Sequence, residues 1–158
     1  MRPFIYTLAA TCLLTFGAAQ AADTTPKVSA SDHMQSAQKA ILAKDWRRAQ
    51  TELNAALRDE PRNADIHNLL GFTARKSTPP HLPEAFAHYK TALEINPQHR
   101  GAHEYLGEAY LMDKQPAEAQ KQLAALEQIC GNKSCEEYGD LAKAIGQYKV
   151  SNHLWAAP

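Results

Sequence analysis

An internal repeat is the feature of this sequence that most restricts how the chain can fold. Three segments align when Ala49, Ala85 and Ala119 are placed at the same position. Each alanine is followed by a large apolar residue after four positions, a small or apolar residue after seven and a proline or glycine after twelve: Leu53, Tyr89 and Leu123, then Ala56, Ala92 and Leu126, then Pro61, Pro97 and Gly131. Self-similarity with a period of about 20 to 50 residues is typical of proteins that stack one supersecondary unit several times.

Each unit is predicted to be a helix, a tight turn and a second helix. A small residue, Ala37, Gly71 or Gly107, precedes the three alanines by 12, 14 and 12 positions. Small side chains allow the backbones of two paired helices to approach closely. The two extra residues of the second unit fall within 77–81, where two prolines interrupt a helix.

A seventh helix is predicted after the three repeats. Residues 135–148 carry apolar side chains at helical spacing, which indicates a helix that covers the open end of the stack. We therefore predict an all-α fold, a right-handed superhelical stack of three helix-turn-helix repeats with a C-terminal capping helix. The boundaries are, in chain order, 1–22 for a signal peptide, 23–29 for a flexible N-terminus, 30–63, 64–99 and 100–131 for the repeats, 132–149 for the cap and 150–158 for a tail.

The repeat pattern resembles the tetratricopeptide repeat, whose signature has a Leu-Gly pair and a tyrosine on the first helix, then an alanine, a large residue and a proline on the second. The matching residues are Leu106, Gly107, Tyr110, Ala119 and Leu123 in the third unit, Leu70, Gly71, Ala85, Tyr89, Ala92 and Pro97 in the second, and Ala49, Leu53, Ala56 and Pro61 in the first. The resemblance covers residues 30–131 and implies a platform for protein partners. The cysteine pair before a short cap also resembles small exported repeat proteins of proteobacteria.

The first 22 residues have the pattern of a secretory signal peptide. Arg2 precedes an apolar run over residues 4–19, and Ala19-Gln20-Ala21 forms a small-residue peptidase site. The run is short for the roughly 20 residues that a membrane span needs. We expect cleavage near Ala21 or Ala22 and export, most simply to a bacterial periplasm. Retention as an uncleaved anchor is the alternative.

The rest of the chain is nearly neutral and contains two cysteines. Its 16 Lys and Arg residues face 17 Asp and Glu residues, so electrostatic attraction to nucleic acid is not expected. Cys130 and Cys135 would enter an oxidising compartment, where a pair of cysteines predicts a disulfide. Four residues separate them, unlike the two-residue gap of a thioredoxin-like redox motif, so we expect a structural link.

Metal binding by histidines is the main alternative to a partner-binding function. His33, His67 and His103 stand where the tetratricopeptide signature usually has tryptophan, and we expect their rings to pack between the two helices of each unit. A copper or zinc site built from His67, His99 and His103 would instead make this a metal-binding envelope protein. The stretch 103–107 lacks the second histidine of a zinc-protease helix, and no serine elbow or phosphate-binding glycine loop occurs. We therefore expect no enzymatic activity and no cofactor.

The concave face is where a partner is expected to bind, because the first helices of stacked repeats line it. Helical spacing from the Leu-Gly pairs predicts a partner-binding groove of ten residues: Met34, Gln38, Ile41, Asn68, Phe72, Arg75, Glu104, Glu108, Leu111 and Met112. Such a mixed surface suits an extended peptide or a helix, unless these side chains simply face solvent.

Two further expectations concern what occupies this groove. Tetratricopeptide domains that bind chaperone C-termini use a cluster of lysines, arginines and asparagines, whereas Met34, Gln38 and Glu104 stand at those places here. Binding of such an acidic tail is therefore disfavoured. As another alternative, Leu154 and Trp155 of the tail would fold back into the groove as an internal plug.

Overall fold

The computed structural model describes residues 27–152 and contains only α-helices within that range. The helices are α1 (Ala30–Leu42), α2 (Trp46–Asp59), α3 (Ala64–Lys76), α4 (Leu82–Ile95), α5 (Arg100–Met112), α6 (Pro116–Ile129) and α7 (Glu136–Ser151). None of these described helices is long and apolar enough to cross a membrane. The predicted signal peptide and the tail residues Leu154 and Trp155 lie outside the described residues.

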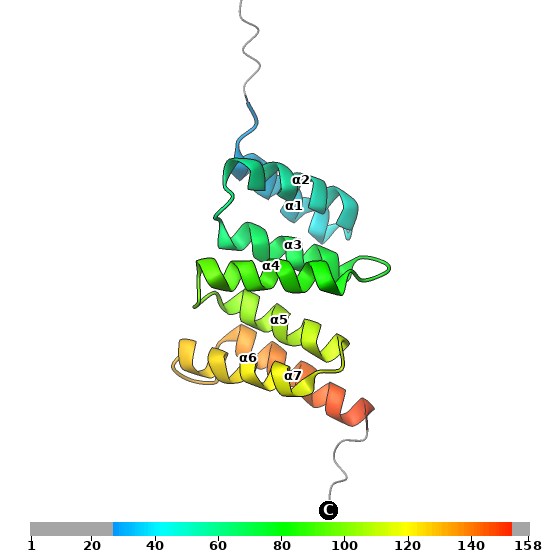
Figure 1. Ribbon diagram of the computed structural model, residues 1–158, viewed down its shortest axis with the longest axis vertical. Helices are drawn as coiled ribbons and strands as arrows, with labels where there is room; N and C mark the ends of the chain where they lie inside the picture. The colour runs from blue at the N-terminus through cyan, green and yellow to red at the C-terminus, as the bar shows by residue number, and fades with distance from the viewer. Residues whose placement is uncertain (1–26, 153–158) are drawn as a thin grey trace, which may run out of the picture.

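The helices are stacked across the long axis of the molecule in chain order, from α1 and α2 at one end to α6 and α7 at the other (Figure 1). The most extensive contacts join α1 to α2, α3 to α4 and α5 to α6, which are the helix pairs of the three units. α5 also contacts both α3 and α7. The predicted all-α repeat stack is confirmed.

Local sequence chemistry explains where the helices begin. The side chains of Ser29, Asp45 and Asn63 accept hydrogen bonds from backbone N–H groups in the first turns of α1, α2 and α3. These bonds satisfy donors that have no partner inside the helix. α4 and α6 begin instead with a proline in the first turn, Pro83 and Pro116, whose missing N–H costs nothing there.

The turn between the two helices of a unit has one geometry in the first and third units. In the first unit, the N–H of Asp45 donates to the carbonyl of Ala40 at 2.9 Å, and Lys44 has a φ of 56°, a left-handed conformation that ends the helix. The second unit closes its longer turn with the N–H of His81 donating to the carbonyl of Ala74 at 3.0 Å. Its two extra residues are therefore accommodated in the turn.

The apolar core is divided into three clusters, and the first helix of the next unit completes each one. The first cluster joins Ala30, Ala37, Leu53 and Ala56 to Ile66 and Leu70 of α3, the second joins Ala74, Ala85 and Tyr89 to Leu106 and Ala109 of α5, and the third joins Leu111, Ala119 and Leu126 to Leu141 and Ile145 of α7. α7 therefore packs on the third unit as the first helix of a fourth unit would.

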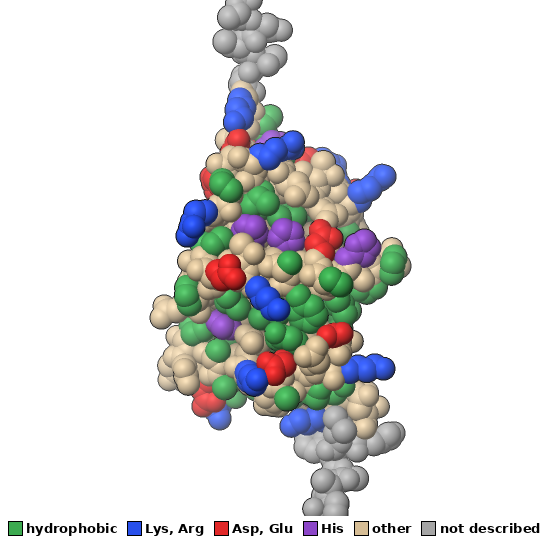
Figure 2. All heavy atoms as spheres, in the orientation of Figure 1, with side chains coloured by type: hydrophobic (Ala, Val, Ile, Leu, Met, Phe, Trp, Pro, Cys, Tyr) green, Lys and Arg blue, Asp and Glu red, His purple; other side chains and the backbone are tan. Residues whose placement is uncertain are grey.

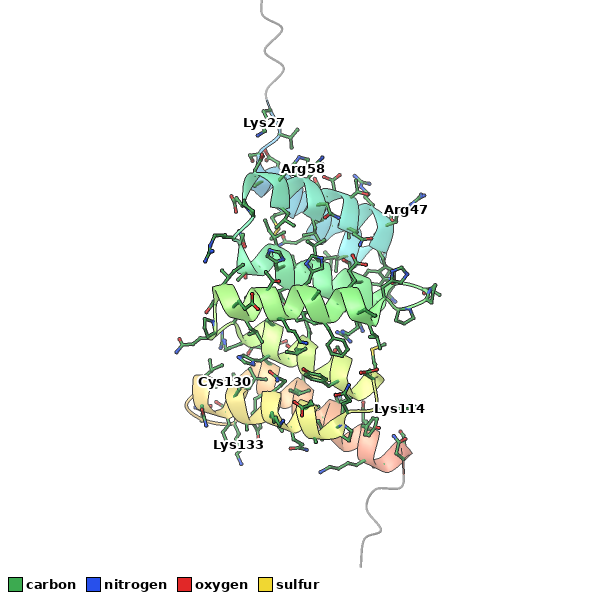
Figure 3. The ribbon with its side chains drawn as sticks, in the orientation of Figure 1. Lys27, Arg47, Arg58, Lys114, Cys130 and Lys133 are labelled. Atoms are coloured by element: carbon green, nitrogen blue, oxygen red, sulfur yellow. A yellow bond between two sulfur atoms is a disulfide. The ribbon has the colours of Figure 1, made fainter. Side chains whose placement is uncertain are left out.

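A disulfide between Cys130 and Cys135 links α6 to α7, as the sequence predicts. Cys130 directly follows α6 and Cys135 directly precedes α7. Figure 3 shows Cys130 and Lys133 at the side of the stack where the chain turns from one helix into the other. The covalent link shortens the free segment between the two helices and so favours the docked position of α7.

Gly71 allows a close approach between α3 and α4. A Cβ atom at this position would lie 2.5 Å from Cε1 of Tyr89, whose ring is fully buried. The matching residue of the third unit, Gly107, lies against α7, because a Cβ there would lie 2.6 Å from Cδ2 of Leu141. The small residue of the repeat signature therefore makes room for a large side chain of a packed helix.

We expect Gly71→Ala to lower the free energy of unfolding by about 1–3 kcal/mol, because the added methyl group would displace the buried Tyr89 ring. Gly146→Ala in α7 is the control, since nothing lies within 4 Å of its added Cβ, and it should raise stability by up to about 1 kcal/mol. Urea denaturation followed by circular dichroism measures both values. A neutral Gly71→Ala would show that the Tyr89 ring does not restrict this position.

Candidate functional site

The three histidines that replace tryptophan connect the two helices of each unit. Nδ1 of His33 lies 2.7 Å from Glu52, Nδ1 of His67 lies 3.1 Å from Nδ1 of His88, and Nδ1 of His103 lies 2.8 Å from Oε1 of Gln122. The three partners, Glu52, His88 and Gln122, each stand three residues after the alanine on which the repeats align. The predicted position of the histidines between the paired helices is therefore correct.

Two of these histidines also connect neighbouring units. Nε2 of His67 lies 3.2 Å from the carbonyl oxygen of Pro61, and Nε2 of His103 lies 3.0 Å from that of Pro97. A carbonyl oxygen only accepts, so Nε2 of His67 carries the hydrogen. In the neutral pair, Nδ1 of His67 then accepts a hydrogen bond from Nδ1 of His88.

The structure does not support the metal alternative of His67, His99 and His103. His99 is the N-cap of α5, where its Nδ1 accepts from the N–H of Ala102 and its Nε2 lies 3.0 Å from a carboxylate oxygen of Asp65. The helix starts only after His99, so the four-residue spacing to His103 does not bring the two rings to one metal. Of the described residues, only Cys130, Cys135 and Glu137 form a group of three potential ligands, and its two sulfurs are joined in the disulfide.

The ten predicted groove residues differ widely in burial. Gln38 and Met112 are exposed, and Ile41, Phe72 and Glu108 are half-buried. Met34 packs against the apolar cluster of the first unit. The remaining four, Asn68, Arg75, Glu104 and Leu111, are buried, three of them with polar or charged side chains. Burial of charged groups in the middle of the predicted groove distinguishes this region from an ordinary solvent-facing surface.

Arg75 is the centre of this region. Its guanidinium is only 5 % exposed and forms an ion pair with Glu108 at 2.5 Å, and its Nε donates to the hydroxyl of Tyr89 at 3.3 Å. It also lies 5.6 Å from the ring centroid of Phe72 and 5.5 Å from that of Tyr105. The pair and the two rings hold the guanidinium in place, so Arg75 forms the floor of the groove.

Glu104 lies one helical turn before Glu108 and is 9 % exposed. Burial raises the pKa of its carboxyl to about 8, and the negative charges of Glu108, Asp140 and Glu137 add to that effect, whereas Arg75 opposes it. Among the described residues, Glu104 makes no hydrogen bond and no ion pair. The groove therefore contains a buried acid that is mostly protonated at neutral pH.

A hollow of about 380 Å³ opens between the ends of α3, α5 and α7. Four predicted groove residues line it, Arg75, Glu108, Leu111 and Met112, and the other residues of its wall are Lys76, Ala144, Gln147 and Tyr148. The three α7 residues of this wall were not among the predicted groove residues. Their helical spacing was visible in the sequence, but it does not reveal that this face of α7 turns toward α5.

Comparison with known proteins agrees with this architecture. Residues 81–131 match the family model described as tetratricopeptide repeat. The TPR2B domain of yeast Sti1, solved in a complex with pHsp70, is similar with a TM-score of 0.64 and 20 % identity, over 80 % of this chain and 98 % of that one. The Sgt2 TPR domain from Aspergillus fumigatus has a TM-score of 0.69 and 16 % identity, over 82 % and 85 % of the two chains. The chain folds as a tetratricopeptide repeat domain. No curated protein sequence matches it.

Acidic and basic side chains are mixed on the face of this tetratricopeptide repeat domain that Figure 2 shows, without a large area of one sign. The labelled cations Lys27, Arg47, Arg58, Lys114 and Lys133 lie at the periphery of the stack in Figure 3.

The His67–His88 pair should make stability fall in acid. Burial lowers the pKa of His88 below its ordinary 6.5, and repulsion from His67 adds to this. Well above pH 6.5 the His88 ring is neutral in both the folded and the unfolded protein. As the pH falls through 6.5 and below, the unfolded chain binds a proton at His88 before the folded protein does, so the free energy of unfolding decreases.

We expect His88→Gln to lose less free energy of unfolding than the wild type between about pH 7.5 and pH 5.5. An amide keeps a hydrogen-bonding partner for His67, as Gln122 does for His103, and does not titrate. His81→Gln is the control, because that side chain is 60 % exposed. Equal acid sensitivity of His88→Gln and the wild type would contradict the role of the pair.

Proposed function

We propose that this tetratricopeptide repeat domain is a non-catalytic scaffold that holds a peptide or protein segment in its groove. The hollow between α3, α5 and α7 carries the proposal. It combines apolar side chains from Leu111, Met112 and Tyr148 with the charged pair of Arg75 and Glu108. Apolar surface supplies affinity for a segment, and the polar groups at its edge orient that segment.

The fold supports this proposal, because stacked repeats present extended concave surfaces for binding. Sti1 provides one case, since its similar TPR2B domain was solved in a complex with pHsp70. The groove chemistry differs from the lysine, arginine and asparagine cluster expected for an acidic chaperone tail. Glu104 is a buried acid in the groove, and the buried Arg75 is already paired with Glu108.

We further propose that the protein acts in the cell envelope, as an exported adaptor or assembly factor of a bacterial periplasm. The signal-peptide pattern of residues 1–22 supports export. The disulfide of Cys130 and Cys135 is consistent with an oxidising compartment.

Met112→Glu should abolish capture of the partner in a crosslinking pull-down from the envelope fraction. Met112 is 44 % exposed in the wall of the hollow, so a charged side chain there should spoil the apolar site without disturbing the core. Ala124→Glu adds the same side chain at an exposed position of α6 and should capture normally. The buried Arg75 is unsuitable for this test, because its loss would break a structural ion pair.

If Met112→Glu captures the same protein as the wild type, the hollow is not the binding site. If the Ala124→Glu control loses capture as well, partner binding involves the outer face of α6. Circular dichroism of both variants, with unfolding curves matching the wild type, ensures that capture reports on the surface alone.

Export predicts a shortened mature protein. Expressed with its native N-terminus in a bacterium, the chain should appear in the periplasmic fraction with an intact mass that starts after Ala21 or Ala22. A protein of full mass in the membrane fraction would indicate the uncleaved anchor instead. A protein of full mass in the cytosol would contradict export.

A further inference from the structure

Two buried acceptor groups of the groove lack a donor. The side-chain oxygen Oδ1 of Asn68 is inaccessible to solvent and has no hydrogen-bond partner, and the residue is 7 % exposed. Glu104 is 9 % exposed and makes no hydrogen bond among the described residues, and its carboxyl oxygens, unlike Oδ1 of Asn68, still reach solvent. The two residues occupy the same repeat position, immediately after His67 and His103. Polar groups of largely buried residues are normally satisfied, so the unbonded carboxyl of Glu104 indicates a missing donor.

Both groups lie at the junction of α3 and α5. Nδ2 of Asn68 lies 3.2 Å from the position that a Cβ of Gly101 would take, and Gly101 is about one helical turn before Glu104 on α5. The absent side chain of Gly101 therefore makes room for the Asn68 amide beside the turn that carries Glu104.

The two arginines nearest to Glu104 in the sequence and in the groove, Arg100 and Arg75, already have acidic partners. Arg75 pairs with Glu108 at 2.5 Å, and Nε of Arg100 lies 3.5 Å from Glu137. Acidic groups therefore outnumber free hydrogen-bond donors around Glu104, and burial together with the negative charges of Glu108, Glu137 and Asp140 raises the pKa of its carboxyl. A ligand that completes this region must bring hydrogen-bond donors and a positive charge.

The spacing of the acids favours an organic cation over a metal ion. No three of the described carboxylates bring their oxygens within 4.8 Å of one another here, as compact metal coordination requires. An arginine side chain fits better, because its planar guanidinium presents five N–H donors and is weakly hydrated. Such a fork can donate two N–H groups to one carboxylate, whereas a lysine offers a compact, strongly hydrated charge.

The distance from Glu104 to the apolar hollow determines how far apart the arginine and the apolar residue of the ligand must be. Glu104 and Leu111 are seven residues apart on α5, which corresponds to about 10 Å along the helix axis. An extended chain covers that distance in about three residues. The Arg75–Glu108 pair lies between Glu104 and Leu111, and its two charges balance each other. The ligand residues between the arginine and the apolar residue therefore need no charge.

We propose that the groove binds a partner-protein segment with an arginine against Glu104 and an apolar side chain, about three residues away, in the hollow lined by Leu111, Met112 and Tyr148. This proposal rests on the proposed scaffold function and names the chemistry of its partner. The arginine supplies the donors that Glu104 lacks, and the apolar residue covers the hollow that α7 helps to form.

Binding of such a segment should strengthen as pH rises toward about 8. The free carboxyl of Glu104 is protonated at neutral pH, and a guanidinium beside it favours the ionised form. The charged groups that face Glu104 are Glu108 on its own helix, Arg75 on α3, and Glu137 and Asp140 on α7. Binding of an arginine at neutral pH should therefore release a proton from the carboxyl of Glu104.

The test uses two short peptides, Gly-Arg-Ser-Ser-Leu-Gly and Gly-Leu-Ser-Ser-Arg-Gly, which place arginine and leucine three residues apart in either chain direction. Each is titrated to about 1 mM into the isotopically labelled protein and followed by NMR, a range suited to weak binding. At least one should shift amide signals of α5 and α7. Replacing its arginine by citrulline, a neutral analogue of similar shape, should weaken binding about tenfold or more.

Variants assign the effect to Glu104. Glu104→Gln should bind the arginine and citrulline peptides alike and lose the pH dependence, while Glu94→Gln, at an exposed position of α4, should behave as the wild type. If the wild-type protein binds the citrulline peptide as tightly as the arginine peptide, the proposed arginine site is wrong. The same holds if neither arginine peptide shifts a groove signal. The Met112→Glu capture experiment tests the scaffold function separately, so the two proposals can fail independently.

Discussion

The structure depends on a shortage of apolar surface within each repeat. A pair of helices cannot enclose its own core, so Leu53 and Ala56 of the first unit need Ile66 and Leu70 of the second. The same dependence continues to the end of the stack, where Leu126 needs Leu141 of α7. Each unit is therefore stable only with its neighbour, which is the property that makes stacked repeats fold together.

This dependence on α7 gives the last helix two roles. Leu141 packs against Gly107 and completes the core of the third unit, while Ala144, Gln147 and Tyr148 form one wall of the hollow. The disulfide at its start keeps α7 attached to α6. Stability of the stack and shape of the groove are thus coupled, because displacement of α7 would remove both.

The groove differs from the rest of the surface because its polar groups are buried. Arg75 has its charge balanced by Glu108 and its faces covered by Phe72 and Tyr105, which makes it a rigid part of the protein. Glu104 and Asn68 have no such partners. Satisfied polar groups stabilise the fold, whereas unsatisfied ones favour a ligand, and the two kinds lie on neighbouring turns of α3 and α5.

The sequence by itself determined the helix pairs, the closing helix and the Cys130–Cys135 link, because these follow from local spacing: small residues where helices cross, prolines in turns and at helix starts, and apolar residues at helical period. It also placed Arg75, Glu108, Leu111 and Met112 in one groove. Only the tertiary structure decided that Arg75 is paired, that Glu104 is buried without a partner, and that α7 supplies a wall. Those properties depend on side chains from separate units meeting in space, and no local pattern in the sequence records such distances.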